Sequence, residues 1–327
     1  MSATMRAVVV DSPGDVDVMR VRDIPVPVPA EGQVLIRVHA FGLNRSELHF
    51  RQGLAYSGSF PRVPGIEATG TVESAPGGEF APGAQVVTMM GGMGREFDGG
   101  YAQFVVVPAA QVTPFVSSLP WDQLGAVPEM LQTAFGSLEV GVHAQPGQSL
   151  LIRGGTSSVG LALAVLGKLR RVTVLSTTRR EAAIPLLRSV GVDHVLIDDG
   201  NVAPQVRRLF PGGVDGAVEL VGVNVMKDTL RAVRPGGTVS FTGMLSDQWT
   251  IPDFYPMEWL PNGVRLTAYS GEAADLPASA LQEFLDAVAA GGAVIPVGRV
   301  YSMDDIAQAH HDMEAGTING KGVVLPW

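Results

Sequence analysis

The chain contains no cysteine among its 327 residues. This absence excludes disulfide bonds, catalytic thiolates and zinc sites with cysteine ligands. Charged residues are few, at 17%, and acidic residues outnumber basic ones, so the formal net charge is -9. A negative surface disfavours nucleic acid and anionic membranes as partners. An anionic ligand therefore needs local basic groups and backbone amides.

Long apolar runs are also lacking. The longest, at residues 161–167 and their neighbours, falls well short of the roughly 20 residues that a membrane helix needs. The start of the chain, residues 1–14, has neither the basic end nor the apolar core of a signal peptide. We therefore expect a cytoplasmic protein that acts on a small molecule.

Glycine (40 residues) and proline (23 residues) are plentiful, which is typical of strands joined by tight turns. Short Val-rich segments bounded by Gly, Pro or Asp fill the first third of the chain and predict a barrel-like β domain. Its strands are expected at residues 5–10, 33–40, 68–73, 85–89 and 101–107, with a short helix at residues 46–51.

After Pro120, short apolar strands alternate with helical segments, which indicates a doubly wound parallel sheet. Strands are predicted at residues 149–152, 172–176, 194–197, 216–220, 238–242 and 265–269. Helices are predicted at residues 161–169, 181–189, 203–209 and 225–233. The end of the chain adds helices at 279–290 and 305–314 and strands at 298–301 and 321–325.

The clearest local motif is the turn GGTSSVG at residues 154–160, between a buried strand and an apolar helix. Such a turn offers unpaired amides and the positive end of a helix dipole to a pyrophosphate. We expect Gly155 to permit the tight turn, Gly160 to permit close helix–strand contact, and Ser157 to donate a hydroxyl hydrogen bond. The alternative is an ordinary loop of small residues. The predicted cofactor contacts are Gly155, Ser157, Ser158, Val159 and Gly160.

The second strand of this sheet ends in Thr177, Thr178, Arg179 and Arg180. NAD enzymes usually carry Asp or Glu near this point, where the carboxylate binds the ribose hydroxyl. Hydroxyls and arginine suit a 2′-phosphate instead. The segment therefore predicts NADPH as cofactor, with Thr177, Thr178 and Arg179 as contacts. Alternatively, the two arginines only lie on a solvated helix start.

With these motifs in order, the chain resembles the medium-chain dehydrogenase/reductase superfamily, and within it the zinc-independent quinone oxidoreductase (zeta-crystallin-like) branch. The resemblance covers nearly the whole chain and includes residues 5–8 (MRAV), 42–47 (GLNRSE), 64–70 (PGIEATG), 99–104 (GGYAQF), 154–160, 234–237 (RPGG) and 320–322 (GKG).

This resemblance implies an α/β protein with two domains. Residues 1–120 and 269–327 would form a GroES-like β-barrel catalytic domain, and residues 121–268 an inserted Rossmann-type NADP-binding domain, with the active site at the junction. It also implies a homodimer, for which the edge strand at 265–269 is the expected seam. Further cofactor contacts follow from it at Arg45, Thr133, Gly222, Gly243 and Lys321.

Zinc-dependent members of this superfamily carry metal ligands at three positions that match Asn44, Ile66 and Glu129. Asparagine is a poor zinc ligand and isoleucine is none, so we expect no catalytic metal. The histidines show no ligand spacing, and His310 with His311 is expected on a surface helix. Without a Lewis acid, a quinone or an α,β-unsaturated carbonyl is the favoured substrate, because its negative charge delocalises onto oxygen.

The catalytic candidates are Asn44, Ser46 and His49. Zinc alcohol dehydrogenases keep Ser and His at the last two positions as a proton relay. Asn44 would then donate a hydrogen bond to the substrate oxygen, while Ser46 and His49 move the proton. The alternative is that Asn44 caps a helix and His49 is exposed to solvent.

Tyr56, Met93 and Tyr255 are the predicted wall of the substrate pocket. The aromatic segment from Trp249 to Trp259 belongs either to that wall or to a dimer contact. Taken together, these features predict an NADPH-dependent quinone or enone oxidoreductase. Two other functions stay open: an enoyl-thioester reductase, and a non-catalytic NADPH-binding sensor or stress protein.

Overall fold

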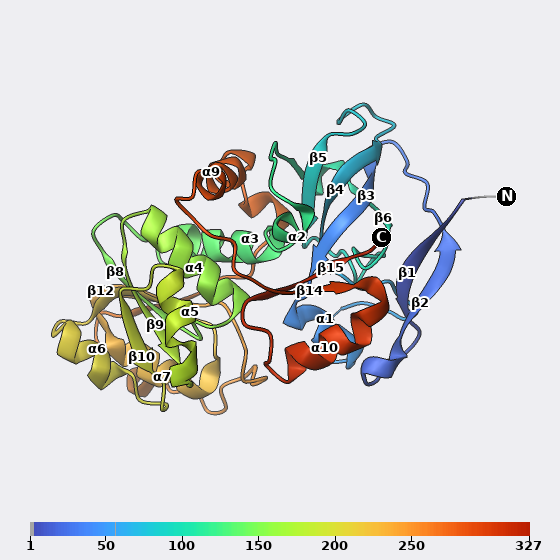
Figure 1. Cartoon of the computed structure of the whole chain (residues 1–327). Helices are drawn as coiled ribbons and strands as arrows, with labels where there is room; N and C mark the ends of the chain where they lie inside the picture. The colour runs from blue at the N-terminus through green and yellow to red at the C-terminus, as the bar shows by residue number, and fades with distance from the viewer. Residues whose placement is uncertain (1–2, 56) are drawn as a thin grey trace. The chain divides into compact units, whose positions relative to one another are not determined.

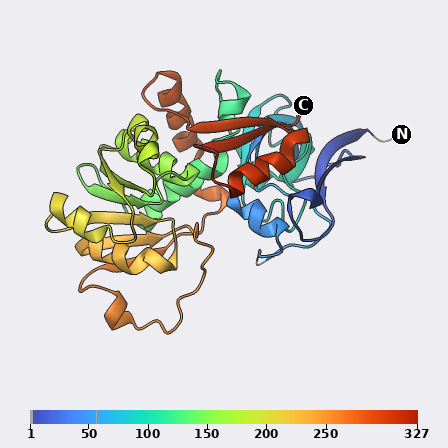
Figure 2. The same cartoon turned by 60° about the horizontal axis from the view of Figure 1, so that its bottom comes forward.

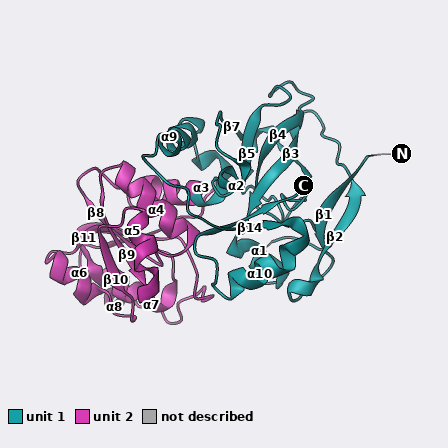
Figure 3. Cartoon of the chain, viewed as in Figure 1, with its two compact units in different colours: residues 1–130, 272–327 teal, residues 131–271 magenta. Residues whose placement is uncertain are grey.

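The structure, a computed structural model, describes residues 3–55 and 57–327 (Figure 1). The chain divides into two compact units, which Figure 3 shows in different colours. Unit 1 comprises residues 1–130 and 272–327, and unit 2 comprises residues 131–271. The division falls within helix α3 (Pro128–Gly136).

Unit 1 is built on a seven-stranded sheet. The strand order is β14-β15-β3-β4-β5-β7, and β6 also pairs with β3; all pairs are antiparallel except β14 with β15. These strands are β3 (Gln33–Gly42), β4 (Glu67–Ser74), β5 (Gln85–Met89), β6 (Phe104–Pro108), β7 (Val112–Pro114), β14 (Val297–Ser302) and β15 (Lys321–Leu325). In Figure 1 the red strand β15 lies beside the blue β3, with Val323 opposite Gly42. The end of the chain therefore folds back onto its beginning.

A separate hairpin of β1 (Thr4–Val10) and β2 (Met19–Pro25) joins unit 1 through bridges such as Ala7 to Ala102. The helices of the unit are α1 (Arg45–Arg51), α2 (Trp121–Leu124), α9 (Ala278–Ala289) and α10 (Ile306–Glu314). Because α2 packs against β3, β4 and β15, residues 121–130 belong to unit 1, although the sequence places the boundary at 120.

The core of unit 1 is formed by alternate strand residues such as Val34, Ile36 and Val38. His310 is also fully buried, and its Nε2 lies 3.0 Å from the Tyr101 hydroxyl. The prediction of a surface position was therefore wrong for His310. Its place on α10 follows Ile306 by four residues, so both side chains lie on the face that packs into the core.

Unit 2 contains a six-stranded sheet in the order β10-β9-β8-β11-β12-β13, with all strands parallel. Its strands are β8 (Ser149–Arg153), β9 (Thr173–Thr178), β10 (His194–Ile197), β11 (Val214–Glu219), β12 (Val233–Phe241) and β13 (Arg265–Ala268). Its helices are α4 (Ser158–Leu169), α5 (Ile184–Ser189), α6 (Ala203–Leu209), α7 (Val223–Ala232) and α8 (Pro256–Trp259).

Helices cover both faces of this sheet in Figure 2, with α4 on one face and α7 on the other. The predicted doubly wound sheet is thus confirmed. The strand order reverses between β8 and β11, and ligands of such sheets bind at the carboxyl ends of the strands beside that point.

Sequence patterns missed the strands β2 and β7 and the helices α2, α3 and α8. β2 (MRVRDIP) carries charged residues between its apolar ones and buries little of its surface, so its pattern resembles a loop. Within residues 3–55 and 57–327, none of the helices combines the length and the apolar character needed to span a membrane.

Candidate active site

The turn between β8 and α4 requires its glycines. Gly154 has a φ of +90°, in the left-handed region, whereas Gly155 does not, so the prediction named the wrong residue for the tight turn. A Cβ on Gly155 would lie 1.8 Å from the Ser176 Oγ, and one on Gly160 would lie 2.7 Å from the Gly154 carbonyl oxygen. Gly155 and Gly160 therefore permit close packing of the turn against β9 and of α4 against the turn.

Ser157 is the N-cap of α4. Its hydroxyl accepts a hydrogen bond from the Gly160 amide (3.1 Å) and donates one to the Gly154 carbonyl (2.9 Å). The expected donation to a phosphate is therefore contradicted, because the hydroxyl hydrogen is used within the turn. The amides of Ser158 and Val159 lie in the first turn of α4, where no intrahelical acceptor exists. These amides and the helix dipole fit the pyrophosphate of a dinucleotide.

Gly222 and Gly243 lie together at the carboxyl ends of β11 and β12. A Cβ on Gly243 would lie 2.8 Å from the Leu220 carbonyl oxygen, and Gly222 has a φ of +132°. The two chain segments are held in contact by a hydrogen bond from the Leu245 amide to the Leu220 carbonyl (3.0 Å). The Leu220 amide in turn bonds the Arg153 carbonyl of β8 (3.0 Å), so both glycines adjoin the point where the strand order reverses.

The end of β9 offers arginines rather than threonines to a ligand. Thr177 is buried, and its hydroxyl accepts from the Gly154 amide (3.1 Å). The Thr178 hydroxyl accepts from the Arg180 amide (3.1 Å) and donates to its carbonyl (3.2 Å). Both predicted hydroxyl contacts are thus engaged inside the protein. Arg179 and Arg180 are exposed and remain the groups suited to a phosphate.

Thr133 lies in α3, within the part of the helix that belongs to unit 2. Its hydroxyl donates to the Gln132 Oε1 (3.1 Å), and the Gln132 amide donates to the Tyr269 hydroxyl (2.7 Å). The sequence had not singled out Gln132 or Tyr269, since nothing in their spacing connects α3 with the end of β13.

In unit 1, Asn44 precedes α1, and both the nitrogen and the oxygen of its side-chain amide make hydrogen bonds. Its Nδ2 donates to Oε1 of Glu67 (2.9 Å) and of Glu47 (3.3 Å), and its Oδ1 accepts from Lys321. The Glu47 carboxylate accepts from the Asn44 backbone amide (3.0 Å) and from the Ile66 amide (2.8 Å). The nitrogen and the oxygen of the Asn44 amide group are thus both engaged within unit 1, against the predicted donation to a substrate oxygen, and at the helix start it is the Glu47 carboxylate that accepts a backbone amide.

Lys321 is fully buried among oxygen atoms of unit 1. Its Nζ lies 2.8 Å from Oε1 of Glu67 and 3.2 Å from Oε2 of Glu129. Burial lowers the pKa of Lys321, but the charges of Glu67 and Glu129 outweigh this and raise it above its ordinary value. The ammonium is therefore charged and enclosed, which contradicts its predicted contact with a cofactor.

The carboxyl groups around this ammonium are also perturbed. Burial raises the pKa of Glu67, partly offset by Lys321, and burial raises the pKa of Glu47 to about 7. Two of the three positions matched to zinc ligands, Asn44 and Glu129, bind the Lys321 ammonium. Within the described part of the chain, no three His, Asp or Glu side chains converge as a metal ion would need.

Ser46 and His49 lie one turn apart on α1. The Ser46 hydroxyl accepts a hydrogen bond from the Arg95 guanidinium, and His49 is buried, so the alternative of a solvent-exposed His49 is wrong. Arg45 is half-buried at the start of the helix. Arg95 was missed by sequence reasoning because it lies in a glycine-rich loop with no spacing relation to α1.

The predicted substrate wall is not assembled as expected. Tyr56 lies outside the described residues, and Met93 packs in the core of unit 1 with 1% of its surface exposed, so it presents no open wall. Tyr255 is exposed next to α8 of unit 2. Nearby, an apolar hollow of about 470 Å³ is lined by Val223, Met226, Phe241, Trp249, Ile251, Phe254, Leu266, Thr267 and Ala268.

Comparison with known proteins places this geometry in context. Family models described as "Alcohol dehydrogenase GroES-like domain" and "Zinc-binding dehydrogenase" match residues 30–117 and 190–324. The chain is 30% identical to the quinone oxidoreductase of Mus musculus over 336 residues, which cover 98% of each protein.

Two solved structures share the fold over nearly the whole length of both chains. A mycobacterial protein, Rv1454c, solved in complex with NADPH, has a TM-score of 0.86 at 27% identity, covering 98% of this chain and 100% of its own. An NAD-dependent alcohol dehydrogenase has a TM-score of 0.88 at 25% identity, covering 99% and 100%. The predicted fold class, a GroES-like domain with a Rossmann-type domain, is confirmed.

Proposed function

Because this chain belongs to the medium-chain dehydrogenase/reductase superfamily, we propose that it reduces quinones or α,β-unsaturated carbonyls with NADPH and without a metal ion. Membership itself makes it an NAD(P)-dependent oxidoreductase. The choice of NADPH rests on the end of β9, where Arg179 and Arg180 are exposed and the last residues of the strand include no Asp or Glu. The NADPH complex of Rv1454c and the name of the murine relative support the cofactor and the substrate class.

NADPH, when bound, supplies the hydride. Residues of unit 2 would hold it: the amides of Ser158 and Val159 would bind the pyrophosphate, and Arg179 and Arg180 would bind the 2′-phosphate. A side chain at Gly222 would collide with Ser246, and one at Gly243 would collide with Leu220, so both glycines keep the chain closely packed beside the proposed cofactor site.

The residues of unit 1 supply the proton and the positive charge. Ser46 and His49 lie three positions apart on α1, and the proposed route takes a proton from the imidazole to the product through the hydroxyl. Arg95 donates to Ser46 and places a cation beside it, which stabilises a developing oxygen anion. The buried Lys321 ammonium already occupies the oxygen-rich centre of this unit, where it opposes the entry of a metal cation.

We also propose that the protein forms a homodimer and functions in the cytoplasm. β13 is an outer strand of the sheet of unit 2 and has an unpaired edge in the single chain. Such an edge pairs readily with a second copy across a two-fold axis.

Oxidation of NADPH in the presence of a panel of quinones and enones tests the reaction. Turnover with at least one class of acceptor is expected. Tight NADPH binding with no turnover on the panel would instead favour a sensor. Turnover with an added enoyl thioester, but with none of the quinones and enones, would favour an enoyl-thioester reductase.

Replacing Arg179 by alanine is expected to weaken NADPH binding by at least roughly tenfold, since one charge-assisted contact is worth about 1.5–3 kcal/mol. NADH binding should remain nearly unchanged, because NADH lacks the 2′-phosphate. Arg188→Ala, an exposed residue in the last turn of α5, is the matched control. Titration calorimetry with both cofactors measures the effect, and equal affinity of the wild type for the two would contradict the proposal.

Treatment with EDTA is expected to leave turnover intact, because Asn44 and Glu129 bind Lys321 and Ile66 has no donor side chain. The family model named for zinc binding covers residues 190–324 and contains none of these three positions. Metal analysis of purified active protein provides the check. Stoichiometric zinc whose removal abolishes turnover would overturn this part of the proposal.

A further inference from the structure

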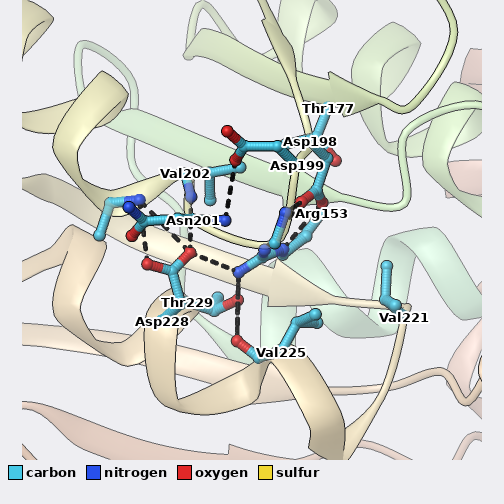
Figure 4. A network of polar contacts seen from close by, with 12 residues as sticks. Arg153, Thr177, Asp198, Asp199, Asn201, Val202, Val221, Val225, Asp228 and Thr229 are labelled. Atoms are coloured by element: carbon cyan, nitrogen blue, oxygen red, sulfur yellow. Dashed lines mark hydrogen bonds and ion pairs between the residues drawn. The ribbon is translucent and has the colours of Figure 1, made fainter.

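Arg153, the last residue of β8, carries a fully buried guanidinium directly before the phosphate-binding turn. Its Nε and Nη2 donate to the two carboxylate oxygens of Asp198, both at 2.9 Å. Its Nη1 donates to Asp228 (2.7 Å) and Thr229 (3.0 Å). Figure 4 shows Asp198 and Asp228 on opposite sides of this guanidinium. The Nε and Nη2 edge of the guanidinium therefore binds Asp198 at two points.

Asp198 lies beside the end of β9. In the register of β9 and β10, Ile197 is opposite Thr178, and the Asp198 amide donates to the Thr178 carbonyl (2.8 Å). Asp198 is therefore the acid next to the segment that leads into Arg179. Burial raises the pKa of Asp198, but hydrogen bonds from Arg153 and the Arg153 charge outweigh this and lower it, so the group is ionised. The following acid, Asp199, is exposed, where water and salt screen its charge.

In NAD enzymes an ionised acid after the second strand binds the ribose hydroxyl and would repel a 2′-phosphate, and Asp198 lies beside that position, after β10. We propose that Arg153 is a positioning residue that determines cofactor specificity: it holds and neutralises Asp198, so that a nucleotide with a 2′-phosphate is accepted. The inference rests on the proposed use of NADPH and adds a residue that never touches the phosphate. Without Arg153, the carboxylate of Asp198 would keep the Gly200 amide (3.0 Å) and the Thr177 hydroxyl as donors but would lose its balancing positive charge.

A double-mutant cycle on Arg153 and Asp198 tests the inference. In Arg153→Gln, the Kd for NADPH should rise by about tenfold or more, since an unpaired like charge now stands near the phosphate. The Kd for NADH should stay nearly the same or fall. Adding Asp198→Asn should restore the wild-type ratio of the two constants, because the amide carries no charge. Asp228→Asn, which removes the other acid at Arg153, should leave the ratio unchanged.

Restoration of the ratio separates specificity from folding, because a merely structural loss would change both constants by the same factor. An equal change for both cofactors, or a double variant that stays as poor as the single one, overturns the inference. If Arg153→Gln does not fold, Arg153→Lys keeps the charge without the two-point contact. Arg153→Lys should lower the preference for NADPH less than Arg153→Gln would, and adding Asp198→Asn should again restore the wild-type ratio of the two constants. An unchanged ratio in Arg153→Lys overturns the inference.

The same measurements distinguish this inference from the proposed function. A wild type that binds NADPH and NADH equally removes the proposed cofactor preference. The role of Arg153 is tested separately, by the change in the ratio of the NADPH and NADH dissociation constants between the wild type and the variants of the double-mutant cycle.

Discussion

Replacing Lys321 by methionine is expected to lower the free energy of unfolding by about 3–5 kcal/mol at pH 8, the cost of leaving buried charges unpaired. The ammonium is the positive partner of Glu67 and Glu129, at 2.8 and 3.2 Å, and Glu67 is fully buried. Urea denaturation measures the loss. Lys168→Met is the matched control, because the ion pair of Lys168 with Asp193 is partly exposed and is worth about 1 kcal/mol or less.

The loss in Lys321→Met should depend on pH in a definite direction. Burial already raises the pKa of Glu67 in the folded state, and removal of the ammonium raises it further. A carboxyl group whose pKa is higher in the folded than in the unfolded protein contributes most to the free energy of unfolding below its unfolded pKa. This contribution is lost as the pH rises through the folded pKa. The variant should therefore be closest to wild type at or below the unfolded pKa of a glutamic acid, roughly 4.3, and least stable relative to wild type at alkaline pH.

The double variant Lys321→Met/Glu67→Gln separates charge from packing. A neutral amide at position 67 removes the unpaired carboxylate, so much of the lost stability should return at pH 8. A double variant that is no more stable than Lys321→Met, together with a loss independent of pH, would show that Lys321 contributes only by filling space.

Replacing His49 by phenylalanine is expected to slow turnover by roughly 10²-fold or more, the usual contribution of a general acid. Addition of hydride to a conjugated carbonyl leaves an enolate that must gain a proton, and an imidazole exchanges protons readily near neutral pH. NADPH binding should be unaffected, because His49 is not expected to touch the phosphates of the cofactor. Steady-state rates and cofactor titrations measure the two quantities.

His311→Phe provides the control, since His311 is exposed on α10. Circular dichroism of both variants checks that the buried site at His49 still folds. A rate loss below threefold for His49→Phe, with an unaltered pH profile, would mean that water protonates the product and that His49 is a bystander.

The sheet of unit 2 and the glycine-rich turn between β8 and α4 could be predicted from the sequence alone. Its strands are short apolar runs, and its Gly154–Gly160 turn has a fixed spacing, so local pattern and backbone sterics were sufficient. The strand at His194–Ile197 and the helix at Ala203–Leu209 were predicted with their observed bounds. The family resemblance likewise placed the last strand, Lys321–Leu325, with the beginning of the chain.

The partners of the polar side chains could not be predicted from the sequence, because they depend on how distant segments pack together. Asn44 and Lys321 are 277 positions apart, and their hydrogen bond, which ties up the Asn44 amide, depends on β15 pairing with β3. Arg153 and Asp198 are 45 positions apart, and their pairing depends on the order of β8, β9 and β10. Spacing along a chain reports which face of an element a residue occupies. The partner of a buried charge is set by which strands lie side by side, and that is a property of the folded chain alone.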